Sequence, residues 1–273
     1  MAVKIITDST CDISLERAAE LGIEVVCLKV TIDGVTYVDK AELSCGEFYK
    51  KLAQCKETPV TSLASPDDFI KVFSKYPDDD IVGVFISSRL SGTYQSAVIA
   101  KEELKRDNIW LVDSQSVACG LAILVEYGVK MRDERKSPAE IAQKLSELAP
   151  KTEIHAAVDT LKYLVKGGRL SGVAGAFGTL LKIKPILTVK GGEVLNTGKE
   201  KGMAAAMERL KKTVDEAEIF EDAGCYGGHT DAEEECMEFL KKLGLESSPI
   251  CSIGSVVGTH AGPKAIAVAF VRK

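Results

Sequence analysis

The sequence predicts an α/β protein with two parts. The N-terminal part is expected to be a mostly parallel α/β sheet domain, and the C-terminal part an α+β domain with a mixed or antiparallel sheet. In the first half, short apolar runs alternate with helical patterns, which favours parallel strands joined by helices. In the second half, a glycine-turn hairpin is mixed with helices. The length of 273 residues favours two modest domains over one.

The first half contains three apolar runs bounded by turn residues, and these are typical of buried strands: Val3–Thr7, Val82–Ile86 and Ile109–Val112. Glu24–Ile32 is a longer β-branched run, which we expect to form one extended strand segment. Asp33-Gly34 follows it and predicts a hairpin turn into Val35–Val38.

Three helix starts can be recognised from their capping residues. Ser44 with Glu47 forms a capping box. Ser65 precedes a proline and two aspartates, and Ser137 also precedes a proline, so each is expected to cap a helix. Pro150 ends the last of these helices, and we therefore predict domains at 1–150 and 151–273.

The second half is expected to contain strands, one pair of them in a hairpin, mixed with helices. The predicted strands are Ile154–Val158, Ile186–Val189, Glu193–Leu195, Cys225–Gly227, Pro249–Ile253 and Ala265–Val271. The predicted helices are Leu161–Val165, the Ala- and Gly-rich Val173–Leu181, Met203–Val214 and Ala232–Leu243.

Composition excludes several classes of function. The net charge of −5 argues against nucleic acid as a partner, because phosphate neutralisation needs a clustered excess of lysine and arginine. No apolar run is long enough for a transmembrane segment, and no signal peptide is recognised at the start, so we expect a cytoplasmic protein. The eight cysteines are scattered and do not pair with histidines at metal spacing, so we expect reduced thiols, no metal site and no cofactor. Neither a Walker motif nor a well-placed dinucleotide motif is present.

The most informative segment for function is Ile81–Ala97. A predicted buried strand ends at Ser87, and a polar turn then leads into a helix that starts near Thr93. In open α/β sheets, ligands bind beyond the carboxyl ends of the strands, where a helix N-terminus offers unpaired N–H groups. Ser91 and Gly92, together with Thr93, add hydroxyls and room for close approach, so the turn predicts a site for a phosphate or a carboxylate. The simpler alternative is that Ser91 or Thr93 is only a helix cap.

Two other segments could complete this site. His260 lies between glycines and a proline in Gly258–Pro263, which we interpret as an irregular loop that presents one imidazole. Thr61 and Ser62 form a second polar turn before the helix capped by Ser65. A loop histidine that is only hydrogen-bonded, and a turn that is only an ST-turn, remain the simpler alternatives.

Two functions are compatible with these residues. A hydrolase would use Ser91 as nucleophile, His260 as base and Asp8 or Asp113 to orient the base, although Ser91 lacks the nucleophile-elbow context. A binding protein for phosphate compounds would use the same helix start.

The order of several motifs resembles the DegV family over nearly the whole chain. The matching segments are Ile6–Asp12, Thr61-Ser62, Ile86–Ala97, Val112–Ser114, Gly167–Leu187 and Gly258–Pro263. The resemblance implies a two-domain carrier that buries a long-chain fatty acid between or beside its domains. It also implies a separate bacterial fatty-acid kinase as partner, which makes acyl phosphate, so that the carrier itself has no catalytic residues.

The resemblance further implies that Thr61 and Ser91 hold the acyl carboxylate. Ser62, Gly92 and Thr93 would surround it, with His260 nearby and Arg169 at a signature position near the site. The acyl tail would need a dry channel, which we expect the apolar Val117–Val129 helix and the small residues Ala174, Gly175, Ala176 and Gly178 to line or shape.

The chain departs from the family at two places. Leu63-Ala64 stands where the family often has Gln-Pro after Thr-Ser, which removes a polar amide beside the expected carboxylate. Lys199 and Lys201 follow the hairpin where the family is often arginine-bearing, and lysine is a weaker bidentate partner for a docking kinase.

Overall fold

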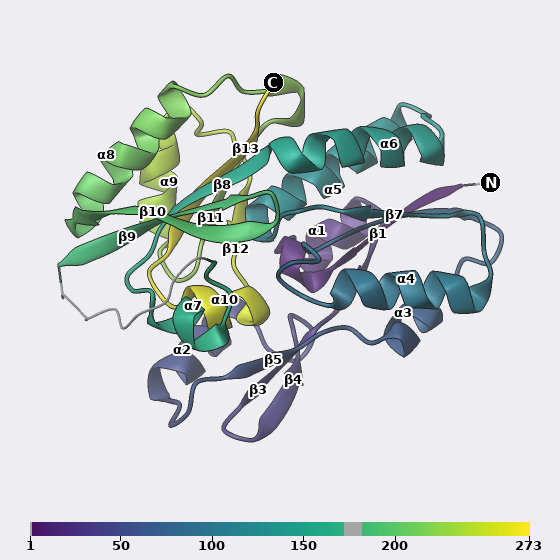
Figure 1. Ribbon diagram of the computed structural model, residues 1–273, viewed down its shortest axis with the longest axis horizontal. Helices are drawn as coiled ribbons and strands as arrows, with labels where there is room; N and C mark the ends of the chain where they lie inside the picture. Colours follow the sequence, from purple (N-terminus) through teal and green to yellow (C-terminus); the bar gives the residue numbers. More distant parts are fainter. Residues whose placement is uncertain (1, 172–181) are drawn as a thin grey trace.

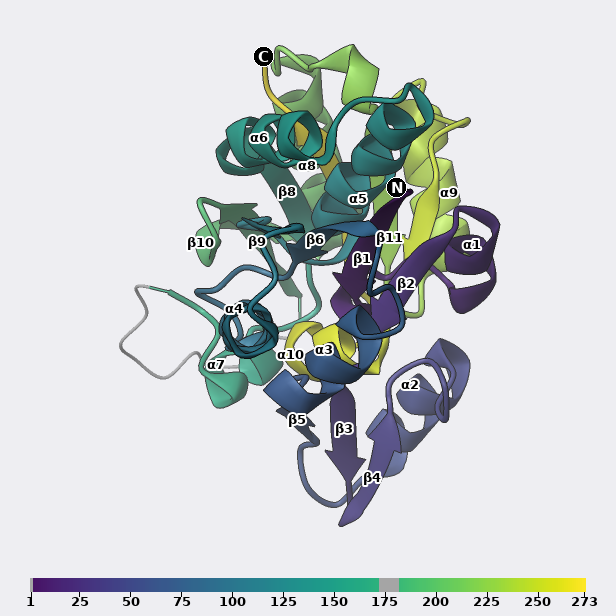
Figure 2. The same ribbon diagram turned by 90° about the vertical axis from the view of Figure 1, so that its right-hand side faces the viewer.

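The computed structural model describes residues 2–171 and 182–273. Within these ranges it contains a four-stranded, a six-stranded and a three-stranded sheet. Figures 1 and 2 show the two larger sheets stacked with helices between them, and the small sheet at one end of the molecule. The expected helix at Val173–Leu181 lies outside the described residues.

The four-stranded sheet is entirely parallel, in the order β2-β1-β6-β7, as predicted. Its strands are β1 (Val3–Asp8), β2 (Ile23–Val26), β6 (Asp80–Phe85) and β7 (Ile109–Asp113). In the central strands apolar side chains are buried on both faces, which is why these segments read as continuous apolar runs.

The prediction of one long strand at Glu24–Ile32 is wrong. Strand β2 ends at Val26, and β3 (Lys29–Ile32) belongs to the three-stranded antiparallel sheet with β4 (Val35–Val38) and β5 (Val60–Ser62). The chain changes sheets at Leu28, whose backbone N–H donates to Ser9 Oγ at 3.2 Å. β-Branched residues flank this junction on both sides, so the break leaves no signal in the residue pattern. The predicted Asp33-Gly34 turn does join β3 to β4.

Six α-helices are described in the N-terminal part: α1 (Leu15–Glu20), α2 (Cys45–Gln54), α3 (Pro66–Phe73), α4 (Thr93–Leu104), α5 (Ala118–Asp133) and α6 (Pro138–Leu148). The predicted caps Ser44, Ser65 and Ser137 are confirmed, and each forms a complete capping box with the residue three positions later. A short 3-10 helix η1 (Ser9–Cys11) begins where Asp8 ends β1.

The six-stranded sheet is mixed, as predicted: β11 and β12 are parallel, and all other neighbours are antiparallel. In spatial order its strands are β10 (Glu193–Lys201), β9 (Ile183–Lys190), β8 (Thr152–Ala157), β13 (Ile266–Val271), β11 (Cys225–His229) and β12 (Ile250–Ser252). The remaining α-helices are α7 (Lys162–Gly167), α8 (Gly202–Asp215), α9 (Glu233–Lys242) and α10 (Ser255–Ala261), and two 3-10 helices are η2 (Ala149–Lys151) and η3 (Glu221–Ala223).

Helix α5 joins the two larger sheets. It contacts β1 and β6 on one side and β8, β11 and β13 on the other. The largest cluster of buried apolar side chains therefore combines residues from both predicted domains, such as Ile5, Leu121 and Ala269. Helices α8 and α9 cover the outer face of the six-stranded sheet, and α3 and α4 cover the outer face of the four-stranded sheet. The boundary near residue 150 falls at η2 and stays a prediction.

The prediction that His260 lies in an irregular loop is wrong, because it lies in the last turn of α10. Gly258 is inside that helix because α10 packs closely on α2. A Cβ at Gly258 would clash with the Tyr49 hydroxyl and lie 2.8 Å from Phe48 Cε1. Gly262, with a φ of 74°, ends the helix.

We expect Gly258→Ala to destabilise the protein by about 1–3 kcal/mol, because the added methyl group overpacks the contact between α10 and α2. The matched control is Gly46→Ala in α2, where an added Cβ would have no neighbour within 4 Å among the described residues outside its own helix. There the free energy of unfolding is expected to stay the same or rise. Urea denaturation of the two variants measures this difference, and equal stability would contradict the close packing.

Candidate functional site

A cavity of about 500 Å³ lies between the six-stranded sheet, the start of α5 and helix α10. Its polar lining residues are Thr61, Ser62, Ser91, Gly92, Arg169 and His260. The remaining lining residues are almost all apolar: Leu28, Leu63, Ile86, Leu90, Val117, Ala118, Cys119, Ile154, Ala156, Val158, Leu164, Leu187, Val189, Val194, Ile253, Val256, Val257, Ala261, Ala265 and Ala267. The cavity therefore has one polar end and a long apolar part.

The turn that carries Ser91 is fixed by contacts on both sides. Asp8, at the end of the neighbouring strand β1, accepts a hydrogen bond from the Ile86 backbone N–H at 2.8 Å. Ser87 Oγ donates to the Gly192 carbonyl at 2.8 Å, which ties the turn to the β9–β10 hairpin. Helix α4 then begins at Thr93, so Ser91 lies directly in front of its N-terminus. Backbone N–H groups at this end are available to an anion.

Thr93 lies behind Ser91 and is fully buried. Its hydroxyl shares a hydrogen bond of 2.9 Å with Ser91 Oγ, and its backbone N–H donates to the same oxygen at 3.3 Å. Thr93 is not among the described residues that line the cavity. It therefore orients the Ser91 hydroxyl, which is the group that faces the cavity.

His260 in α10 and Thr61 in β5 lie next to each other at the polar end of the cavity. His260 Nε2 and Thr61 Oγ1 are 3.1 Å apart, and the tautomer decides which of them donates. Burial, and then the positive charge of Arg169, lower the pKa of His260 to about 4, so the imidazole is neutral at pH 7. Within the described part of the chain His260 Nδ1 has no hydrogen-bond partner.

Arg169 connects the end of α7 to the Ser91 turn. Its Nη1 donates to the Gly167 carbonyl at 2.7 Å, and its Nε donates to the Leu90 carbonyl at 3.3 Å. Gly167 allows α7 to approach His260 closely, because a Cβ there would overlap Nδ1 and lie 2.8 Å from Cε1 of the imidazole. Arg169 therefore places a positive charge at the mouth of the cavity.

The apolar walls come mainly from residues outside the motifs that predict the polar end. Alternate residues of β8, β9 and β13 face the cavity, as Ile154, Leu187 and Ala267 illustrate. The alternation of side chains along these strands indicates which residues share a face of the sheet. It does not indicate which other elements cover that face. Of the expected apolar helix, only Val117, Ala118 and Cys119 line the cavity, and the rest of α5 packs in the core. Ala174, Gly175, Ala176 and Gly178 lie outside the described residues.

The two aspartates considered as partners of a catalytic histidine are engaged elsewhere. Asp8 accepts hydrogen bonds from the Thr10 backbone N–H at 3.0 Å and from Ile86. Asp113 accepts from the Ser88 hydroxyl at 2.5 Å. Ser91 shares its hydroxyl with Thr93, and His260 bonds Thr61, so the hydrogen bonds of a Ser-His-Asp triad are not formed within the described residues.

A second cavity of about 580 Å³ lies between α1, the start of α2 and β12. Its lining mixes charged groups of both signs with hydroxyls, including Asp12, Arg17, Lys40 and Glu126. Charged groups are spread over this lining, so it lacks the separation of a polar end from apolar walls that distinguishes the first cavity.

The described part of the chain offers neither a cluster of metal ligands nor a membrane-spanning helix. In residues 2–171 and 182–273 no three His, Cys, Asp or Glu side chains are grouped to hold a metal ion. Over the same ranges no helix combines the length and the apolar character that crossing a bilayer requires.

Comparison with known sequences places the chain among related proteins. A family model described as "Uncharacterised protein, DegV family" matches residues 2–273. A DegV domain-containing protein of Clostridium perfringens (strain 13 / Type A) is 36% identical over 286 residues, and the match covers 100% of both chains. A DegV domain-containing protein of Deinococcus radiodurans is 32% identical, with 98% of each chain covered.

Solved structures have the same fold over their full length. A DegV lipid-binding protein from Thermotoga maritima is 29% identical with a TM-score of 0.88, and 100% of both chains is covered. A fatty-acid-binding DegV family protein from Thermus thermophilus has a TM-score of 0.89 at 28% identity, again with 100% of both chains covered. DegV of Bacillus subtilis, a fatty acid binding protein, has a TM-score of 0.86 at 26% identity, and 100% of both chains is covered. Since the family model and relatives above 30% identity match the chain from end to end, the protein belongs to the DegV family.

Proposed function

We propose that this protein binds a long-chain fatty acid, with the acyl chain in the 500 Å³ cavity and the carboxylate at its polar end. Ser91 and Thr61 would donate hydrogen bonds to the carboxylate, while Ser62, Gly92 and His260 surround it and Arg169 supplies a positive charge at the mouth. Thr93 would act through Ser91. The observation that carries this proposal is a cavity whose lining is apolar except at one end, where hydroxyls, a helix N-terminus and an arginine converge.

The free energy of binding such a ligand would come from two parts, the apolar chain and the charged head group, which match the apolar walls and the polar end of the cavity. Each methylene removed from water contributes about 0.8 kcal/mol, so the apolar walls supply most of the affinity. The carboxylate must lose part of its hydration and needs donors in exchange. The start of α4 also favours a negative charge through its aligned peptide dipoles. Fatty-acid binding by the Thermus thermophilus and Bacillus subtilis relatives supports the same assignment.

The position of the polar end supports a second part of the proposal, in which the carrier presents the carboxylate to a separate fatty-acid kinase. Ser62, Gly92 and Arg169 are exposed, so the head group would lie near the surface while the chain is enclosed. A kinase could then transfer the γ-phosphoryl group of a nucleoside triphosphate to a carboxylate oxygen, which forms acyl phosphate and releases the nucleoside diphosphate. Lys199 and Lys201 are exposed on β10 and would be available to this partner. All eight cysteines are unpaired thiols within the described residues, which is compatible with the cytoplasm as the place of this step.

The two alternative functions are less well supported. A hydrolase would need Ser91 and His260 hydrogen-bonded to each other and the imidazole oriented by a carboxylate, but both side chains bond elsewhere. A phosphate compound would use the start of α4 but would leave the long apolar part of the cavity without a matching group.

The direct test of binding is native mass spectrometry of the recombinant protein. We expect a mass excess over the denatured chain equal to one long-chain fatty acid, identified by lipid extraction. A protein that emerges empty, and stays empty when palmitate or oleate is added, would overturn the proposal.

Ser91→Ala and Thr61→Ala test the head-group assignment. Loss of a hydrogen bond to a charged group costs about 1.5–3 kcal/mol, so each variant is expected to bind palmitate roughly 10- to 150-fold more weakly. The matched control is Ser88→Ala in the same turn, because the Ser88 hydroxyl donates to Asp113 rather than facing the cavity. Competition with a fluorescent fatty acid gives the affinities. Wild-type affinity in both test variants would show that the carboxylate lies elsewhere.

His260 predicts a pH dependence of binding. The imidazole has a pKa of about 4 in the lipid-free protein, and a bound anion raises that pKa because it favours the imidazolium. Protons are then taken up on binding, so affinity is expected to rise as the pH falls from 7 toward 4. A long-chain alkanesulfonate is the suitable probe, since its head group stays ionised throughout. The same slope in His260→Ala would rule out this histidine as the titrating group.

A further inference from the structure

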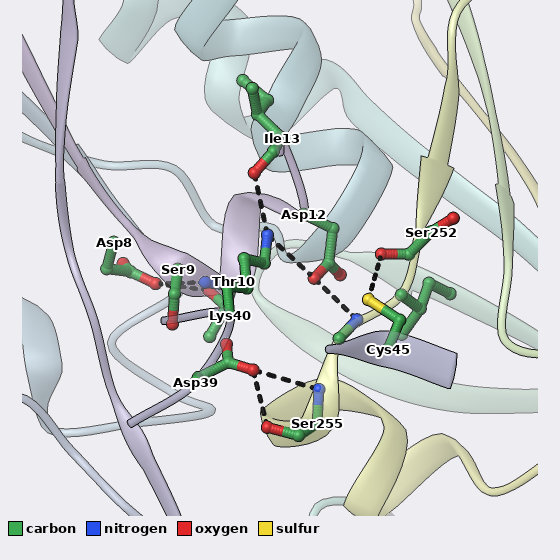
Figure 3. A network of polar contacts seen from close by, with 12 residues as sticks. Asp8, Ser9, Thr10, Asp12, Ile13, Asp39, Lys40, Cys45, Ser252 and Ser255 are labelled. Carbon is green, nitrogen blue, oxygen red and sulfur yellow. Dashed lines mark hydrogen bonds and ion pairs between the residues drawn. The ribbon is translucent and has the colours of Figure 1, made fainter. Parts of the chain in front are cut away.

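We propose that the buried cluster of Asp12, Lys40 and Asp39 is a positioning device for the lipid site, which acts by fixing helix α10 and with it the imidazole of His260. This inference rests on the proposed function, and it names residues that lie outside the fatty-acid cavity. Figure 3 shows the cluster around the N-terminal end of α10.

The two aspartates hold the first backbone amides of α10. Asp12 Oδ1 accepts a hydrogen bond from the Gly254 N–H at 2.9 Å. Asp39 Oδ1 accepts from the Ser255 N–H at 3.1 Å and from the Ser255 hydroxyl at 2.6 Å. Both carboxylates therefore sit at the positive end of the helix dipole, and both come from segments that are far from α10 in the sequence.

Lys40 links the two segments that carry these carboxylates. Its Nζ lies 3.4 Å from Asp12 Oδ1 and donates to the Ile13 carbonyl at 3.0 Å. The side chains of Lys40 and Asp12 are only 8% and 1% exposed. Asp12 and Lys40 also both have left-handed backbones, with φ values of 56° and 65°. Non-glycine residues keep this conformation only where the surroundings determine it, so the geometry of the pair is rigidly set.

The cluster contains two carboxyl groups and one ammonium group, and all three side chains are buried. Within the described residues, Asp12 Oδ2 and Asp39 Oδ2 are buried without a hydrogen-bond partner. Burial raises the pKa of Asp12 to about 7, although Lys40 opposes the shift. Such a cluster is weak as a source of stability. Its ordered bonds to Gly254 and Ser255 point instead to a role in fixing geometry.

The other end of α10 carries the functional group. The helix has seven residues, which corresponds to roughly 10 Å, and His260 in its last turn bonds Thr61. Thr61 lies on β5, which pairs with β3, and Asp39 follows directly on β4 of the same small sheet. This sheet therefore holds α10 at both ends: Asp39 holds the start and Thr61 meets the end. Just before the start of α10, the Tyr49 hydroxyl donates to the Ile253 carbonyl at 2.9 Å.

A displacement of α10 would be transmitted directly to the polar end of the cavity. The helix is too short to bend, and Gly167 leaves the His260 ring no room to compensate on its Nδ1 side. Loss of the Asp39 bonds should therefore move the imidazole relative to Thr61 and Ser91 while the apolar walls remain.

The test compares Asp39→Ala, Asp39→Asn and Ser255→Ala in the full chain. Asp39→Ala removes the acceptor and is expected to weaken palmitate binding at least tenfold, as for the loss of a head-group contact. Asn retains an acceptor oxygen, so Asp39→Asn should rescue most of the affinity, and Ser255→Ala should give an intermediate loss. Binding of hexadecanol, which has the same chain length without a carboxylate, should change much less than binding of palmitate. Equal losses for the acid and the alcohol would overturn the proposal.

A double-mutant cycle separates positioning from general destabilisation. In a His260→Ala background, Asp39→Ala should cause little further loss of palmitate binding, because both changes affect the same contact. Additive losses would contradict the proposal. The matched control is Glu153→Ala, which removes another buried carboxylate, paired with Lys190 and Arg272 away from the cavity, and should leave palmitate binding unchanged below its unfolding temperature.

The lipid-free protein gives a readout that does not depend on fatty-acid binding. An NMR titration of His260 should show its depressed pKa in wild type and a return toward 6.5 in Asp39→Ala, because the imidazole leaves its buried place. An unchanged pKa in that variant would overturn the positioning role. If wild type binds no palmitate, the proposed function fails, and this titration still decides whether the cluster positions His260.

Discussion

Burial of helix α5 on nearly all sides is the constraint on which the rest of the structure depends. From Ala118 to Val125 every residue of this helix is buried. A helix that is apolar all round must be covered all round. The four-stranded sheet covers one side and the six-stranded sheet the other, so two sheets of different topology share one core. The cavity lies where this helix begins, at Val117, Ala118 and Cys119, and its walls are therefore continuous with that core.

The two ends of the cavity are built in different ways. The apolar part is lined partly by alternate residues of the sheet strands β8, β9 and β13. The rest of its lining comes from apolar side chains of α5, α7, α10, β10 and the connecting segments. The polar end depends on groups from several elements that must meet within hydrogen-bond distance: the turn before α4, strand β5, the last turn of α10 and the end of α7. Each of these is held by a bond to a distant segment, such as Ser87 to Gly192 and Arg169 to Leu90. Specific hydrogen bonds between distant segments thus create the polar end, whereas the walls need only apolar side chains on the elements that enclose them.

The difference between local and long-range contacts explains what could be predicted from the sequence. The caps at Ser44, Ser65 and Ser137 involve partners three residues away, and the Asp33-Gly34 turn is equally local, so all four were predictable. The change of sheet at Leu28 was not, because pairing partners decide it and the residues on both sides favour strands equally. The helix at His260 was missed because two glycines favour a loop, whereas the ring of Tyr49 requires the glycine at 258. Six of the seven predicted site residues line one cavity, but their motifs contain no information on the strand residues that enclose it.

Because the cavity is continuous with the core, its occupancy would affect how quickly the protein is degraded in a cell. An occupant that fills the space beside α5 becomes part of the interior, and it stabilises the folded chain against the open forms that proteases attack. An empty molecule would lack these contacts, so it would open more often and be degraded sooner. Abundance would then follow the supply of the molecule that fills the cavity, without any change in synthesis.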